Sequence, residues 1–399
     1  MMQSIKSEEY YVGNLYQRFP VNIVKGKGCK VWDKDGKEYL DCMGGYGVAL
    51  VGHCNDRVVN AITNQVQDLI TCHMSVYNEM RLKFLEKFAL IAPKNLRKTF
   101  VTNSGTEAVE AALKFSRKFT GKDGILALNG GYHGKTFGSL SVTYNEKYRK
   151  SFLPLFENVK FVSYSEMDSI INIVSNPENK IGTMIVEPIQ GETGIIMPPQ
   201  NFLKNIRNIC TDKGIVLIFD EIQSGLGRTG KMWAGEHWDV EPDVMCLAKG
   251  IAGGVPMGVT TMRPEILDCL KIGEHSSTFA GNPLACAAGS AAIDALTEDN
   301  LVENSSKVGK LFKEGLLELK AKHKIVRDVR GLGLMLGIEM RFDVKDILLD
   351  GIKHGILLLY SGRNILRLLP PLVMDETEVN KSLGLIDILL ENEVKRRIG

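Results

Sequence analysis

The stretch IVLIFDEIQSGLGRTGKMWAGEHWDVEPDVMCLAKG, residues 215–250, decides the fold. It contains two short apolar runs, 215–219 and 244–248, and each run ends abruptly in a polar residue, Asp220 or Lys249. Apolar runs of this length, bounded by turn residues, are typical of strands buried on both faces of a parallel sheet. Because ligands of such sheets collect beyond the carboxyl ends of the strands, Asp220 and Lys249 are predicted to face a common ligand.

Asp220 and Lys249 are open to two interpretations. Pyridoxal phosphate enzymes hold their cofactor as a Schiff base on a lysine, and an acidic residue pairs with the ring nitrogen so that the ring acts as an electron sink. The same two residues also fit a helix-capping Asp and a surface Lys at two ordinary strand ends. The stretch alone fits both interpretations equally, so other parts of the chain have to distinguish them.

The composition is that of a globular protein. Of the 399 residues, 44% are hydrophobic and 24% charged, and the net charge of +2 without a basic tract gives no general attraction to nucleic acid or membranes. The eight cysteines are scattered, with no C-x-x-C pair, so we expect reduced thiols rather than disulfides or a metal site. No apolar run is long enough to span a membrane, and no signal peptide is apparent. These features predict a cytoplasmic protein.

The chain is predicted to divide into three segments. Residues 1–55 read as an N-terminal arm followed by a small antiparallel meander at 21–45, and both belong to the smaller domain. Residues 56–290 are expected to form the large cofactor-binding domain, and residues 291–399 a C-terminal α+β domain. No linker or repeat marks these boundaries.

Strands alternate with helices through the middle of the chain, which predicts a mostly parallel sheet covered by helices on both faces. In the C-terminal segment, two strand-like runs, 325–340 and 356–371, alternate with amphipathic helices. The predicted fold is therefore α/β: a large domain with a mixed, mostly parallel sheet between helices, and a smaller α+β domain.

A candidate phosphate site lies in KTFVTNSGTEAVEAALKFSRKFTG, residues 98–121, which reads as a strand, a polar turn and an amphipathic helix. Ser104, Gly105 and Thr106 occupy the helix start, where free backbone amides and the helix dipole attract an anion. Gly105 permits a close approach of the ligand. The alternative is an ordinary N-cap with Glu107 in the first turn.

Two further strand ends carry polar residues. ILALNGGYHGKT, residues 125–136, is predicted to be a strand and a glycine-rich loop that bears Tyr132, His133 and Lys135. TMIVEPIQGETG, residues 183–194, is predicted to be a second buried strand, and it ends in the polar residues Glu187, Gln190 and Glu192. An aromatic ring such as that of Tyr132 can stack on a flat cofactor ring.

GLGRTG, residues 225–230, matches the dinucleotide-binding pattern G-x-G-x-x-G. That pattern must follow its strand directly and open a helix. Here Asp220–Ser224 intervenes, and the residues that follow are aromatic and contain proline. We therefore interpret the loop as a structural turn, and a non-catalytic nucleotide-binding protein remains the remote alternative.

The strand-end groups together suit a pyridine aldehyde that carries a phosphate. Gln223 could bond the ring hydroxyl, Asp220 would pair with the ring nitrogen, and Lys249 would form the imine and then shuttle the proton. An amine partly withdrawn from water and beside a cationic cofactor should have a lowered pKa, as a base working near neutral pH requires.

With these motifs, the chain resembles the class III aminotransferases over nearly its whole length. These aminotransferases are fold-type I pyridoxal phosphate enzymes. The motifs that carry the resemblance are NSGTEAVEAALK, GGYHGKT, VEPIQGETG, LIFDEIQSGLGRTGKMWA, PDVMCLAKGIAGGVPMG, HSSTFAGNPLACAA and ILRLLPPL. Within the class the chain is most similar to acetylornithine aminotransferases and to the lysine/ornithine branch, whose substrates are presented on LysW, an acidic amino-group carrier protein.

The resemblance implies a transaminase that moves a terminal amino group to 2-oxoglutarate in arginine or lysine biosynthesis. Glutamate and 2-oxoglutarate would be the common substrates, with LysW as a possible partner. It also implies a cytoplasmic homodimer with shared active sites. Ornithine δ-aminotransferase and 4-aminobutyrate aminotransferase are the nearest alternatives.

Several residue roles follow from the resemblance. Thr278 would reach the cofactor phosphate of the neighbouring subunit, and Ser277 would lie at the substrate. Arg367 would bind the α-carboxylate of glutamate, and Glu192 would pair with Arg367 when an ω-amine is bound. Tyr16 would line the far end of the pocket.

The predicted sets combine these roles. The catalytic residues are Lys249, Asp220 and Glu192. The residues that bind the cofactor are Ser104, Gly105, Thr106, Tyr132, His133, Asp220, Glu221, Gln223, Lys249 and Thr278. The residues that bind the substrate are Tyr16, Lys135, Glu192, Ser277 and Arg367.

The chain departs from the family at one position. The family usually has Phe-His-Gly-Arg-Thr where this chain has Tyr132-His133-Gly134-Lys135-Thr136. Lys135 replaces the arginine expected to bind the distal carboxylate of the substrate. Because lysine is a point charge without a planar fork, binding there should be weaker or differently directed. We expect Lys135 to influence which amino donor or acceptor is used.

Overall fold

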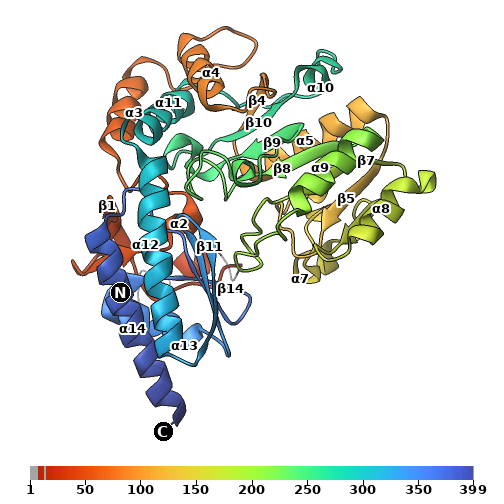
Figure 1. Cartoon of the computed structure of the whole chain (residues 1–399). Helices are drawn as coiled ribbons and strands as arrows, with labels where there is room; N and C mark the ends of the chain where they lie inside the picture. Colours follow the sequence, from red (N-terminus) through yellow and green to blue (C-terminus); the bar gives the residue numbers. More distant parts are fainter. Residues whose placement is uncertain (1–7, 13–14, 399) are drawn as a thin grey trace.

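A seven-stranded sheet forms the centre of the computed structural model, which describes residues 8–12 and 15–398 (Figure 1). In their order across the sheet, the strands are β4 (Lys98–Thr102), β10 (Gly258–Met262), β9 (Val244–Leu247), β8 (Val216–Asp220), β7 (Ile181–Val186), β5 (Gly124–Leu128) and β6 (Val159–Val162). Only β10 runs antiparallel to its neighbours. The sheet is thus mixed and mostly parallel, as predicted, although no strand was predicted at the position of β10.

Helices pack on both faces of this sheet and around it (Figure 1). They are α3 (Asp56–Asp68), α4 (Glu79–Ile91), α5 (Gly105–Thr120), α6 (Phe137–Ser141), α7 (Glu146–Arg149), α8 (Met167–Ser175), α9 (Phe202–Lys213), α10 (Pro264–Asp268) and α11 (Pro283–Glu298). Alternate residues of β5 enter two cores: Ile125 and Ala127 pack with α5, whereas Leu126 and Leu128 pack with α9. Burial on both faces explains why the parallel strands are continuous apolar runs.

The C-terminal part of the chain forms a separate antiparallel sheet backed by two long helices (Figure 1). Its elements are α12 (Leu301–Lys322), β11 (Val326–Leu332), β12 (Met335–Met340), α13 (Lys345–His354), β13 (Ile356–Leu357), β14 (Leu359–Ser361), β15 (Ile365–Leu368) and α14 (Glu376–Ile398). Each run predicted as one strand contains a chain reversal. In the first run the reversal comes at Gly333, whose φ is +53°.

The N-terminal meander consists of β1 (Ile23–Lys27), β2 (Lys30–Asp33) and β3 (Glu38–Asp41), followed by the short turn α2 (Gly44–Gly47). Strand β13 adds to β3 in parallel, so the meander completes its sheet with a strand from the C-terminal part. This pairing agrees with assigning the meander to the smaller domain. The domain boundaries at residues 55 and 290 remain a prediction.

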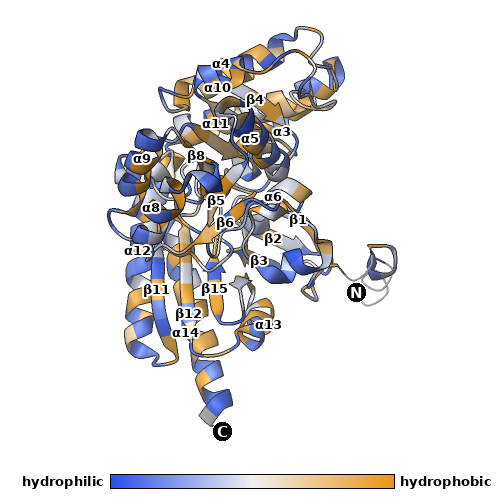
Figure 2. Cartoon of the chain, turned by 90° about the vertical axis from the view of Figure 1, so that its right-hand side faces the viewer, coloured by the Kyte–Doolittle hydropathy of each residue, from blue (hydrophilic) through white to orange (hydrophobic). Residues whose placement is uncertain are grey.

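The described residues of the N-terminal arm, 8–12 and 15–20, precede the meander, and Figure 2 shows the first of them standing away from the body of the chain. Their large apolar side chains, among them Tyr10, Tyr11, Leu15 and Tyr16, are mostly exposed. In the described part of the chain, no helix is both long and apolar enough to cross a membrane.

Candidate active site

The candidate site lies at one edge of the seven-stranded sheet. Because β10 is antiparallel to both β4 and β9, the carboxyl end of β4 lies at the same edge as those of the parallel strands β5, β7, β8 and β9. Every strand end that carries a predicted cofactor residue therefore meets there. This edge is where open α/β sheets bind ligands.

Asp220 is the last residue of β8, and its carboxylate is held by two neighbours. Its Oδ2 lies 2.8 Å from Nδ1 of His133, and its Oδ1 accepts a hydrogen bond of 3.1 Å from the backbone N–H of Ile222. Asp220 and His133 are both buried. The other ring nitrogen of His133, Nε2, is buried and has no hydrogen-bond partner among the described residues.

Lys249 follows β9 and begins a short 3-10 helix, Lys249–Ala252. Its φ of +50° lies in the left-handed region, which non-glycine residues occupy mainly where the surrounding structure imposes it. Burial lowers the pKa of its amine to about 8, against the opposing influence of the Asp220 and Glu187 charges. This lowered pKa agrees with the direction expected of a lysine base.

The start of α5 and the loop before α6 are joined by hydroxyl groups. Ser104 caps α5 by accepting a hydrogen bond from the backbone N–H of Glu107. The hydroxyl of Thr106 lies 2.8 Å from that of Thr136, in the loop that bears Tyr132. The first amides of a helix have no partner within it, so those of Gly105 and Thr106 can receive an anion.

Gly134 permits the close approach between this loop and α5. Its φ is +132°, and a Cβ built there would lie 2.4 Å from Oγ1 of Thr106. A side chain at residue 134 would therefore push the loop away from the helix start.

Glu187 is a buried carboxylate that the predicted sets omit. Its Oε1 accepts a hydrogen bond from the backbone N–H of Tyr132, and its Oε2 accepts one from Gly191, both at 2.9 Å. Burial raises the pKa of this carboxyl to about 7. Glu187 thus ties the loop that bears Tyr132 to the loop that bears Glu192. Its position directly after a buried apolar run, like that of Asp220, was the signal available in the sequence.

Arg367 reaches from β15 of the C-terminal sheet to the edge of the large sheet. Its Nη2 forms an ion pair of 3.1 Å with Oε2 of Glu192, and its Nη1 donates to the carbonyl of Gly191 at 3.1 Å. Its Nε donates to the carbonyl of Tyr360. The guanidinium is almost fully buried, whereas the Glu192 side chain is 37% exposed. The hydroxyl of Ser361 donates to the carbonyl of Glu192.

Gln223 and Glu221 follow Asp220 but differ in their surroundings. Gln223 lies beside the same loop as Glu192, since a Cβ built on Gly191 would lie 2.0 Å from its Oε1. Glu221 is buried, and its oxygens accept hydrogen bonds from the amides of Ala234 and Gly235. The structure therefore connects Glu221 with the following turns rather than with the other predicted cofactor residues.

The remaining predicted residues, three for the substrate and Thr278 for the cofactor, lie in three places. Lys135 is exposed, and its Nζ is 4.6 Å from the centre of the Tyr148 ring, next to Glu192. The hydroxyl of Ser277 accepts a hydrogen bond of 3.0 Å from Nδ2 of Asn103, just before the start of α5. Thr278 and Tyr16 are exposed and make no hydrogen bond with the other predicted residues in the described part of the chain.

The GLGRTG loop packs against the C-terminal part of the chain. Arg228 is fully buried, and its Nη1 donates to the carbonyls of Leu334 (2.9 Å) and Pro370 (2.5 Å). A Cβ on Gly230 would lie 2.9 Å from the backbone of Ser306. The only helix that follows directly is a short 3-10 turn, Ala234–Trp238. These contacts agree with the interpretation of the loop as a structural turn.

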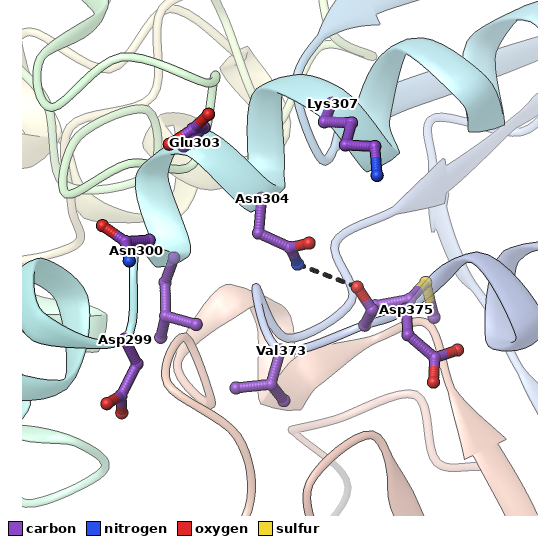
Figure 3. Close-up of a pocket in the computed structure, with 9 residues that line it drawn as sticks. Asp299, Asn300, Glu303, Asn304, Lys307, Val373 and Asp375 are labelled. Atoms are coloured by element: carbon purple, nitrogen blue, oxygen red, sulfur yellow. Dashed lines mark hydrogen bonds between the residues drawn. The ribbon is translucent and has the colours of Figure 1, made fainter.

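A pocket of about 410 Å³ lies elsewhere, between the start of α12 and residues 373–375 (Figure 3). The Asn304 side chain crosses it by donating hydrogen bonds to the carbonyls of Leu372 and Met374. None of the predicted site residues lines this pocket. It does not belong to the candidate site.

The residues at the sheet edge fit pyridoxal phosphate. They supply free helix amides for a phosphate, an aromatic ring, an anion beside a buried histidine with an unpartnered nitrogen, and an amine of lowered pKa. A cofactor with a phosphate, a flat ring, a protonated ring nitrogen and an aldehyde has a counterpart for each of these groups.

Known proteins resemble the chain along its whole length. The family model of the class-III aminotransferases matches residues 11–390. An acetylornithine aminotransferase from Methanopyrus kandleri is 43% identical over 94% of this chain and 96% of its own length. A LysW-aminoadipate semialdehyde/glutamate semialdehyde transaminase from Sulfurisphaera tokodaii is 40% identical over 96% and 98% of the two chains.

The solved structure of the ornithine aminotransferase from Toxoplasma gondii superimposes with a TM-score of 0.95 at 29% identity. The match covers 100% of this chain and 96% of the other, and that structure has pyridoxal phosphate at partial occupancy in its active site. The family match, the identities and the fold agree with one another. The chain belongs to the class-III aminotransferases, enzymes that depend on pyridoxal phosphate.

Proposed function

We propose that this aminotransferase moves the terminal amino group of acetylornithine, or of lysine or ornithine held on an amino-group carrier protein, to 2-oxoglutarate. Relatives named for acetylornithine and for LysW-linked substrates support this proposal, at about 40% identity over nearly the full length. The enzyme would then serve arginine or lysine biosynthesis in the cytoplasm.

The observation that carries the proposal is the ion pair between Glu192 and Arg367. Glutamate brings a carboxylate next to its amino group, and a buried guanidinium is a suitable partner for it. The reacting end of an ω-amine has no carboxylate, so Arg367 would be left as an uncompensated buried charge. Glu192 compensates that charge and is exposed enough to move aside for glutamate. An enzyme that alternates between these two substrates needs such a pair.

The bound cofactor supplies an electron sink and accepts the amino group. The residues of this chain hold and move the protons. With a pKa of about 8, the Lys249 amine exists in both protonation states near neutral pH, so its Nζ can take up and return a proton. Asp220, held by His133, would keep a negative charge at the ring nitrogen. The ring of Tyr132 would cover one face of the cofactor, and the amides of Gly105 and Thr106 would hold its phosphate.

A homodimer with shared active sites is part of the proposal. Exposed apolar side chains occur on the N-terminal arm, in residues 69–77 and in residues 272–279, as a subunit interface requires. Thr278 lies exposed in the last of these segments, where a second copy of the chain could be reached. Sedimentation of the purified enzyme should give twice the mass of one chain.

A carrier-borne substrate is supported by the lysines around Tyr148, whose hydroxyl bonds to Glu192. Lys135, Lys147 and Lys150 are exposed in this part of the chain, and a basic surface suits an acidic carrier. Free acetylornithine would not need these charges. Salt should therefore weaken the reaction with a carrier-linked substrate more than the reaction with acetylornithine.

Steady-state rates test the proposal directly. We expect the highest kcat/KM with acetylornithine or carrier-linked lysine, and parallel lines for two-substrate kinetics because the amino group is held on the enzyme between the half-reactions. A higher kcat/KM with ornithine or 4-aminobutyrate would assign the chain to one of those activities instead. The purified enzyme should be yellow, and borohydride should fix the cofactor on Lys249.

A further inference from the structure

Tyr148 lies on α7 and touches three residues that are predicted to contact the cofactor or the substrate. Its hydroxyl donates a hydrogen bond of 3.3 Å to Oε1 of Glu192. Its ring packs edge-on against that of Tyr132, with the centroids 5.8 Å apart and the planes at 77°. The ammonium of Lys135 lies 4.6 Å from the ring centre.

The hydrogen bond from Tyr148 gives the Glu192 carboxylate a second partner. Arg367 holds one carboxylate oxygen, Oε2, and Tyr148 holds the other. Burial, and next the charge of Glu192, raises the pKa of Tyr148 to about 12, so the hydroxyl keeps its proton and remains a donor at neutral pH. The two-point attachment fixes Glu192 over Arg367, and this arrangement suits an ω-amine.

The ring of Tyr148 has a separate effect on Lys135. A cation over an aromatic face is attracted to it, so the ring restricts where the ammonium can lie. Lysine has a flexible stem and no planar fork, so its position depends on such a contact more than that of an arginine would. The ring therefore orients the residue at which this chain departs from its family.

We propose that Tyr148 is a positioning residue for substrate choice: its hydroxyl holds Glu192 over Arg367 for the ω-amine, and its ring orients Lys135. The proposal rests on the proposed function, because it assigns Tyr148 to the alternation between an ω-amine and glutamate. The hydroxyl and the ring of Tyr148 therefore have different effects, and two substitutions can test them one at a time.

Tyr148→Phe removes the hydroxyl and keeps the ring. With the Glu192 carboxylate held at one point only, we expect the KM for the ω-amine to rise about 3- to 10-fold, as for the loss of one hydrogen bond of typical net strength. The KM for glutamate, which has to displace Glu192, should stay unchanged or fall. Tyr148→Leu also removes the ring, and should in addition raise the KM for 2-oxoglutarate.

Tyr144→Phe is the matched control, because Tyr144 lies four residues earlier and its ring packs on Phe161 away from the site. It should leave both KM values unchanged. Equal losses for both substrates in Tyr148→Phe, or no change in either, would overturn the proposal.

Calorimetric binding of glutarate to the holoenzyme gives a readout that does not depend on turnover. Tyr148→Phe should bind this dicarboxylate as tightly as the wild type or more tightly, and weaker binding would count against the inference. If the wild type uses no ω-amine at all, the proposed function fails, whereas the glutarate comparison still tests whether Tyr148 controls access to Arg367.

Discussion

Two parts of the active site differ in how firmly the fold holds them. The inner cluster, consisting of His133, Glu187, Asp220 and Lys249, lies at or just beyond the ends of buried strands. Its carboxylates accept hydrogen bonds from backbone amides, and that of Asp220 also pairs with His133. The rim, consisting of Lys135, Tyr148 and Glu192, lies on loops and a short helix, and its side chains are half-buried or exposed. The difference suggests that chemistry common to all substrates is fixed by the sheet, whereas substrate choice depends on side chains that can move.

The largest effect should come from Lys249→Ala in the inner cluster. Loss of the amine removes both the attachment point of the cofactor and the proton carrier, so we expect kcat/KM to fall by at least about 10⁴-fold with every substrate. Borohydride reduction followed by mass spectrometry should find no labelled peptide in this variant. Lys204→Ala, on the exposed side of α9, should behave like the wild type, and substantial activity of Lys249→Ala would refute the assignment.

Asp220→Asn should have the next largest effect. The amide keeps the shape of the side chain but not its charge, so the ring nitrogen loses its anionic partner and kcat/KM should fall by about 10²- to 10³-fold. The fall should be the same for amine and keto acid substrates, because the inner cluster serves both. A fall in kcat/KM that differs between substrates would show that the inner cluster also influences substrate choice. Asp212→Asn, at an exposed position, is the control.

The pH dependence of stability should report on Glu187. Because its folded pKa is raised from 4.5 to about 7, the folded chain binds this proton more tightly than the unfolded chain does. The stabilisation is therefore complete below pH 4.5 and is lost as the pH rises to 7, and a shift of this size corresponds to about 3 kcal/mol.

Urea unfolding of the cofactor-free protein at pH 5 and pH 7 measures this loss. Glu187→Gln should show a smaller difference between the two pH values than the wild type. Part of the difference should persist, because burial also raises the pKa of Glu221 to about 7. The exposed carboxylate variant Glu178→Gln should retain the full difference. An unchanged difference in Glu187→Gln would show that this carboxyl titrates as an ordinary one.

The smallest effect is expected at the rim, from Lys135→Arg. A planar guanidinium can form two parallel hydrogen bonds with a carboxylate, so kcat/KM for 2-oxoglutarate should change about 3- to 10-fold relative to that for the amine. The measurement is the ranking of substrates, not the overall rate. An unchanged ranking would mean that Lys135 does not select the substrate.

Asp220 and Lys249 of the inner cluster were predicted from the residues themselves, whereas the roles of Glu192 and Lys135 at the rim came from the family resemblance, and this difference has a physical reason. Asp220 and Lys249 end buried apolar runs, and Ser104 begins an amphipathic helix, so each is marked by its neighbours in the chain. Because the carboxyl ends of parallel strands lie at the same edge of a sheet, the pattern of these runs is enough to predict that the residues meet there. Glu187 follows a buried apolar run in the same way and was predicted to lie at a strand end, although no role in the site was assigned to it.

Tyr148 could not be predicted in the same way. It lies in a polar segment without periodicity, and its contacts with Tyr132, Lys135 and Glu192 depend on how three separate loops fold over the sheet edge. The reversals within the C-terminal strand runs were missed for a related reason. Gly333 and Gly362 allow turns, but each lies between apolar runs, so the sequence pattern there is that of a continuous strand.

The pairing of β3 with β13 has a consequence for how the chain is made. The meander leaves the ribosome long before Ile356–Leu357, the strand that completes its sheet, has been made. Arg367 follows later still. During synthesis the meander therefore has an open edge until β13 has been made, and the active site cannot be completed before Arg367 has followed. Proteases and chaperones have a long interval in which to act on this edge.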